Sequence, residues 1–194
     1  MKTFKETIKK NRLVISYDNN SESPREWSNL GYFITVDRNY NSPDKNETLE
    51  RIVKETGEVA DDSEDHIKRI KKEIKKEIGE NVLAIYPITK YEHSGVSYSL
   101  GIGNGFDSSN SGFYIVTDKT SKEIGAIKKD FEKLISQELS LYNRWVNGEN
   151  LEFILYDKNG EVEDSSCGFY EIEDIREHLP KEWENENLEN YLNN

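Results

Sequence analysis

The sequence predicts an α+β protein with a mainly antiparallel sheet of about six to seven strands, packed by one long helix and two shorter helices. Two observations predict this class. Strand-like and helix-like segments follow one another as two strands, two helices, three strands, a long helix and a closing hairpin, which is too irregular for a doubly wound sheet. Apolar residues also recur at three- and four-residue steps through 120–146, so the long helix needs a sheet against one face.

The long helix is expected to run from Thr120 to Val146. Thr120 is a suitable N-cap with Glu123 three residues later, and Gly148 stands where a left-handed stop is expected. Its apolar stripe consists of Ile124, Ile127, Phe131, Leu134, Ile135, Leu139, Tyr142, Trp145 and Val146.

The strands are expected where branched and aromatic residues dominate a segment or alternate with polar ones. These segments are 12–17, 30–36, 81–89, 96–101, 113–117, 151–156 and 162–170. The last two flank 157–160, a strong hairpin turn. The two shorter helices are expected over 47–56 and 63–79, the second capped by Ser63 with an isoleucine stripe facing inward.

A chain of 194 residues fits a single domain. We expect one α+β domain over 1–179 and an acidic C-terminal tail over 180–194 that is partly ordered at most. Four apolar residues can dock part of the tail, namely Trp183, Leu188, Tyr191 and Leu192. No apolar run approaches the roughly 18 residues of a membrane span, and no apolar stretch follows the charged start. We therefore expect a cytoplasmic protein that makes no use of a membrane.

Most of the acidity lies in the C-terminal part of the chain. The net charge is −12, and residues 141–194 alone hold 14 Asp/Glu against 4 Lys/Arg. Such a region repels nucleic acid and attracts basic protein surfaces. The alternative is that these acidic groups serve solubility alone. The acidic residues expected to bind a partner are Glu161, Glu163, Asp164, Glu171, Glu173, Asp174 and Glu177.

A loop after the first strand offers a second contact surface. Arg25 and Trp27 belong to residue types that are enriched at interface hot spots. In the alternative interpretation Trp27 packs in the core and Arg25 pairs with a carboxylate.

One window resembles a calcium-binding loop. Oxygen-bearing side chains stand at its positions 1, 3, 5 and 12, from Asp107 to Asp118, with Gly112 at position 6. The alternative is a simple turn at Asp107. Apart from a divalent cation at Asp107 and Asp118, we expect no cofactor and no catalytic residue. The single cysteine, Cys167, cannot form an internal disulfide or a cysteine metal site, and it is expected to be a half-buried strand residue.

Several short segments carry a resemblance to known proteins. They are 17–18, 22–27, 29–31, Tyr91, 93–95, Asp107, 112–113, 164–165 and 167–170. As a set they resemble a family of small, largely uncharacterised proteins encoded by bacteriophages and other mobile elements. The resemblance supplies a setting and no catalytic residues.

In that setting, a small acidic protein of the host bacterial cytosol is expected to inhibit a host defence system, as anti-CRISPR and antirestriction proteins do. Its partner would be a host nucleic-acid-binding protein, such as a Cas nuclease or a restriction enzyme. One alternative is a divalent-metal-dependent hydrolase or nuclease with Asp18, Glu22, Asp107 and His93 near the ion. The other is a virion or replication accessory protein.

Overall fold

The computed structural model describes residues 11–37, 41–56, 63–103 and 105–193. These residues form seven strands in two antiparallel sheets, together with five α-helices and short 3-10 turns. The α+β class is therefore confirmed. Contacts divide the chain into two compact units: a terminal unit made of residues 1–22 and 144–194, and a central unit made of residues 23–143.

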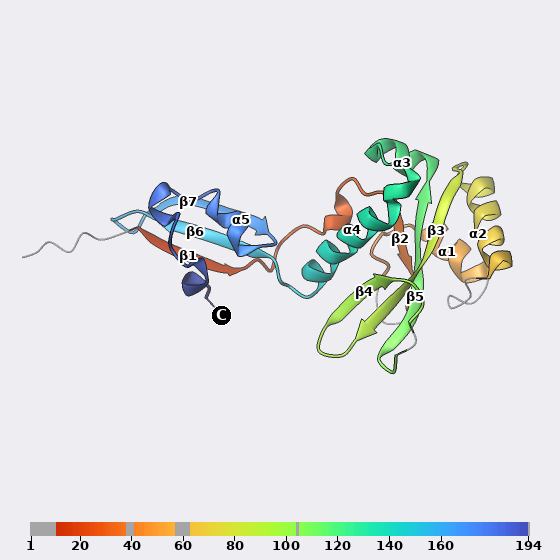
Figure 1. Ribbon diagram of the computed structural model, residues 1–194, viewed down its shortest axis with the longest axis horizontal. Helices are drawn as coiled ribbons and strands as arrows, with labels where there is room; N and C mark the ends of the chain where they lie inside the picture. The colour runs from red at the N-terminus through yellow and green to blue at the C-terminus, as the bar shows by residue number, and fades with distance from the viewer. Residues whose placement is uncertain (1–10, 38–40, 57–62, 104, 194) are drawn as a thin grey trace, which may run out of the picture. The chain divides into compact units, whose positions relative to one another are not determined.

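The terminal unit is built on the sheet β1-β6-β7, in which β6 pairs antiparallel with both neighbours (Figure 1). Its strands are β1 (Arg12–Tyr17), β6 (Leu151–Tyr156) and β7 (Val162–Phe169). Alternate residues of β1 and β6 point into one core, where α5 (Ile172–Arg176) contributes the fully buried Ile175. A strand from the N-terminal part of the chain thus pairs with a hairpin from its C-terminal part in one sheet.

The C-terminal segment packs on this sheet. Two 3-10 turns, η3 (Lys181–Trp183) and η4 (Leu188–Tyr191), bury Trp183 and Leu188 in the same core. Leu192 forms a parallel bridge with Ile15, and the backbone N–H of Asn193 donates to the Ile15 carbonyl at 2.8 Å. The outer edge of β1 is therefore paired with the chain's own C-terminal segment.

The central unit is built on the sheet β2-β5-β3-β4, whose neighbours are all antiparallel. Its strands are β2 (Tyr32–Thr35), β3 (Val82–Glu92), β4 (Val96–Leu100) and β5 (Ser108–Thr117). Two helices, α1 (Glu47–Thr56) and α2 (Glu64–Glu77), cover one face. Their aliphatic side chains pack on Ile34, Phe113 and Ile115.

The opposite face of this sheet packs against α4 (Phe131–Val146) (Figure 1). The Phe33 ring meets the Tyr142 ring of the helix edge-on at 5.5 Å, and meets Tyr98 of β4 edge-on at 5.1 Å. The Asn143 side chain also bonds to both backbone groups of Tyr98. The central unit thus has helices on both faces of its sheet.

The prediction of a single long helix over 120–146 is wrong. The structure has α3 (Asp118–Ile124), a 3-10 turn η2 (Lys128–Asp130) and then α4. Gly125 ends α3 because it adopts the left-handed conformation, with φ of +72°. The stripe therefore breaks, and Ile124 and Ile127 are exposed.

The strands lie in two sheets and not in the one sheet that the sequence predicts. Strand β5 also begins at Ser108, five residues before the expected start at Phe113, because its first three residues pair with residues 89–91 of β3. Further along, Gly112 lets β2 approach closely. A Cβ on Gly112 would stand 2.0 Å from the Ile34 carbonyl oxygen. The single domain over 1–179 stays a prediction.

Candidate functional site

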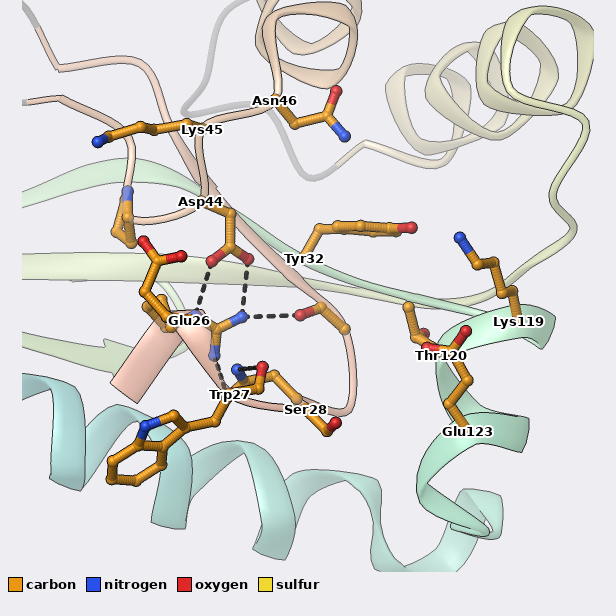
Figure 2. A pocket seen from close by; sticks show the side chains of 14 residues that line it. Glu26, Trp27, Ser28, Tyr32, Asp44, Lys45, Asn46, Lys119, Thr120 and Glu123 are labelled. Atoms are coloured by element: carbon orange, nitrogen blue, oxygen red, sulfur yellow. Dashed lines mark hydrogen bonds and ion pairs between the residues drawn. The ribbon is translucent and has the colours of Figure 1, made fainter. Parts of the chain in front are cut away.

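A hollow of about 520 Å³ opens on the central unit, beside the loop that carries Arg25 and Trp27 (Figure 2). Ser23 begins this loop by capping the 3-10 turn η1 (Pro24–Glu26) through a bond from the Arg25 N–H. The other lining residues come from β2, from the segment 43–46 and from α3. Residues of both signs of charge line the hollow: Lys45 and Lys119 are basic, and Glu26, Asp44 and Glu123 are acidic.

Arg25 is one of the residues that line this hollow, and all five of its N–H groups are engaged. Nε and Nη2 donate to the two oxygens of Asp44 at 2.8 and 2.7 Å. Nη1 donates to Asn29 Oδ1 at 3.0 Å and to Glu138 Oε2 at 2.9 Å, and Nη2 also donates to the Gly31 carbonyl at 2.8 Å. Because every N–H group already has an acceptor, Arg25 has no donor left for a partner. Its side chain is also only 2% exposed.

The acceptors of Arg25 are themselves held in place. Glu138 accepts the Tyr114 hydroxyl and the Leu30 N–H, and Asp44 accepts the Phe33 N–H at 2.6 Å. Burial lowers the pKa of Arg25, but the hydrogen bonds and charge of Asp44 outweigh it, so its pKa lies above the ordinary value. Burial raises the pKa of Tyr114, which stays a neutral donor. The network thus fixes the loop, η1 and α4 to the sheet.

Trp27 differs from its neighbour two residues earlier. It lines the hollow with 48% of its surface exposed, so it can still contact a ligand or partner. In the alternative interpretation, Arg25 pairs with a carboxylate and Trp27 packs in the core. Arg25 does pair with carboxylates, but Trp27 lies outside the core.

The acidic residues of the hairpin lie on the surface of the terminal unit. Glu161, Glu163 and Asp164 are all exposed, and every residue of β7 before Phe169 is exposed as well. Glu163 accepts a hydrogen bond from the Asn11 side chain at 2.7 Å, and Asp164 accepts the Ser165 N–H at 2.8 Å. These three carboxylates form no ion pair among the described residues.

The acidic residues after β7 are exposed too, but most of them form ion pairs or hydrogen bonds with nearby groups. Glu171 pairs with Arg144, and Glu173 pairs with Arg176, which lowers the pKa of Glu173. Asp174 caps the start of α5 by accepting the Glu171 N–H. Glu177 is exposed and forms no ion pair within the described part of the chain. The hairpin thus gathers three exposed carboxylates without ion pairs within residues 161–164.

The predicted calcium loop is a strand. Asp107 and Asp118 flank β5 at its opposite ends, which puts them roughly 35 Å apart at the usual strand rise. The carboxylate of Asp118 instead accepts hydrogen bonds from the backbone and side-chain N–H groups of Asn81, which lowers the pKa of Asp118. His93 stands 3.9 Å from Asp107, but no group of three His, Cys, Asp or Glu suited to a metal occurs among the described residues.

Two features of these surfaces were not foreseen. The carboxylate partners of Arg25 lie 19 and 113 residues away, and nothing in the spacing of Asp44 or Glu138 marks them. Cys167, expected to be half-buried, is exposed. The run from Glu163 to Gly168 contains no large apolar residue, and this signal would have indicated a strand with both faces exposed.

Comparison of the chain with models of protein families, with curated proteins and with solved structures gave no match in any of the three. The resemblance to proteins of bacteriophages and mobile elements therefore stays a prediction. Among the described helices, none has both the length and the apolar character needed to cross a membrane. The cytoplasmic location likewise stays a prediction.

Proposed function

We propose that this protein acts by binding, and that the acidic surface of its terminal unit occupies the nucleic-acid groove of a basic host protein. The setting we propose is inhibition of a host defence system of the anti-CRISPR or antirestriction type. The observation that carries the proposal is the group of exposed carboxylates on the hairpin, Glu161, Glu163 and Asp164, which lack ion-pair partners among the described residues. A basic groove built for phosphates would supply such partners.

The distribution of charge between the two units supports this proposal. The terminal unit holds 17 Asp/Glu against 9 Lys/Arg, whereas the larger central unit holds 21 against 17. If acidity served solubility alone, an even spread over the surface would suffice. The central unit also compensates many of its charges locally, as the pairs Arg51–Glu77 and Lys76–Glu73 illustrate.

No observation on the described residues favours the metal-dependent hydrolase or the virion accessory protein. Asp18, the first residue proposed for a metal, is buried at the end of β1 and accepts the Asn20 N–H at 2.9 Å. We therefore carry only the binding function forward.

The test is capture of partners from a bacterial lysate by the purified full-length chain, at about 0.05 M and about 0.5 M salt, with the captured proteins identified. We expect a nucleic-acid-binding protein that is captured at low salt, lost at high salt and displaced by added DNA or RNA. If added DNA or RNA does not displace the captured protein, binding in its nucleic-acid groove is contradicted.

Two variants with the same change of charge sharpen this test. The first, E161Q/E163Q/D164N, neutralises three acids of the hairpin. The second, E47Q/D65N/E132Q, neutralises three exposed acids of the central unit that do not line the hollow. Capture should fail with the first variant and persist with the second. Equal loss with both would mean that net charge, and not the hairpin, determines binding.

The setting is tested in bacteria that carry an active restriction or CRISPR system. Expression of the wild-type chain should raise the number of phage plaques on such cells, and expression of E161Q/E163Q/D164N should not. Unchanged plaque numbers with every system tested would contradict the inhibitor role while leaving the binding function standing.

A further inference from the structure

The outer edge of β7 is the open edge of the terminal sheet. In the order β1-β6-β7, the described part of β7 pairs with β6 on one side only. Figure 1 shows β7 at the margin of this sheet. The other margin differs, because the C-terminal segment bridges to β1 at Ile15. One edge is thus occupied by the chain itself, and the other presents a row of backbone N–H and C=O groups.

The middle of β7 has regular strand geometry. Register shifts occur at both ends of its pairing with β6, around Glu163 and around Gly168, where φ is +82°. Between them, the four residues from Asp164 to Cys167 pair one to one with Leu155 to Glu152. Three of the four carry small side chains, so an incoming strand would meet little steric obstruction on either face.

The charge beside this edge selects the occupant. Glu161, Glu163 and Asp164 lie on the strand or just before it and are exposed. A second copy of β7 would bring two acidic hairpins close together, and their charges repel one another. Lysine or arginine on an incoming strand would instead meet opposite charge. The charge of this edge therefore disfavours pairing with a second copy and favours a basic strand.

We propose that the free edge of β7 pairs with an extended lysine- or arginine-rich segment of the partner protein, which adds a fourth strand to the terminal sheet. Backbone hydrogen bonds supply the docking geometry, as in other cases of strand addition, and the carboxylates select basic segments. This inference rests on the proposed function in its choice of a basic partner, and it specifies how that partner docks.

The test uses three capped nine-residue peptides and the full-length protein. The first alternates lysine with threonine. The second has the same sequence with two adjacent central amides N-methylated, so that neither edge of the peptide can pair although its charge is unchanged. The third replaces every lysine by glutamate. Binding is measured by isothermal titration calorimetry at about 0.05 M salt.

We expect the first peptide to bind, the methylated peptide to bind about tenfold more weakly, and the acidic peptide not to bind. Equal binding of the first two would overturn strand pairing while leaving the acidic surface of the proposed function intact. If no basic peptide binds, strand pairing is again overturned, and the lysate capture decides the proposed function separately. The variant D164K, checked for an unchanged melting curve, should weaken binding of the first peptide.

Discussion

The two units use charged side chains in opposite ways. In the central unit Arg25 is buried, and each of its donors meets Asp44, Asn29, Glu138 or the Gly31 carbonyl. In the terminal unit the hairpin carboxylates are exposed and form no ion pair among the described residues. A saturated buried charge holds a structure together, whereas an exposed charge without a partner is free to select one. The comparison therefore predicts that stability and binding respond to different substitutions.

The largest loss of stability is expected for Arg25→Met. It removes the cation and leaves the carboxylates of Asp44 and Glu138 without their partner, which costs about 3–5 kcal/mol in buried pairs. The measurement is the free energy of unfolding in urea. Arg25→Lys keeps the charge and loses the planar fork, so its loss should be smaller. Wild-type stability in Arg25→Met would contradict a structural role for this network.

A pair of glycine substitutions extends the comparison to packing. Gly112→Ala puts a Cβ against the Ile34 backbone, so β2 and β5 must separate, at a cost of about 1–3 kcal/mol or more. Gly168→Ala meets no atom within 4 Å and costs only the strain of its positive φ, about 1–2 kcal/mol. Thermal melts of the two variants compare the costs. A larger loss for Gly168→Ala would mean that the β7 bulge is more constrained than the β2–β5 contact.

Alkaline pH should also act on the central unit. Burial raises the pKa of Tyr142 to about 12, and burial together with Glu80 raises the pKa of Tyr32 to about 12. In the unfolded chain tyrosine ionises near pH 10, so the unfolded state loses protons that the folded state retains. The resulting stability is present below about pH 10 and is lost as pH rises towards 12. Urea titrations across this range should show the decline, and Tyr32→Phe should make its slope shallower.

The smallest effect on stability is expected for E161Q/E163Q/D164N. Exposed substitutions of this kind change the free energy of unfolding by about 0.5 kcal/mol or less. The same variant should nevertheless lose capture of a basic partner. Thermal melts followed by circular dichroism test the stability of the variant, and the capture assay tests its binding. A large drop in melting temperature would show that these carboxylates have structural partners.

Local patterns predicted much of the secondary structure. The first strand and the helix over 47–56 have the bounds that the sequence indicates, and Ser63 caps α2 as expected. The hairpin turn at 157–160 is also correct, because Asp157 accepts backbone N–H groups of the turn and Gly160 adopts a positive φ. These features depend on residues close together in the chain, and such preferences are readable from one sequence.

Long-range features could not be predicted in this way. Strand β1 pairs with β6 more than 130 residues later, so the division into two sheets depends on pairing that no local pattern encodes. The break at Gly125 was missed because the apolar stripe continues on both sides of it. For the candidate site, the exposed hairpin acids could be predicted from charge, whereas the burial of Arg25 depends on Glu138, 113 residues away.

The edge of β7 is the binding surface that we propose. Amide hydrogen exchange of the full-length chain, with and without the captured partner, tests it directly. We expect added protection that is confined to the terminal unit and is largest in Val162–Phe169. Added protection around Trp27 and the hollow of the central unit, with β7 unchanged, would contradict it.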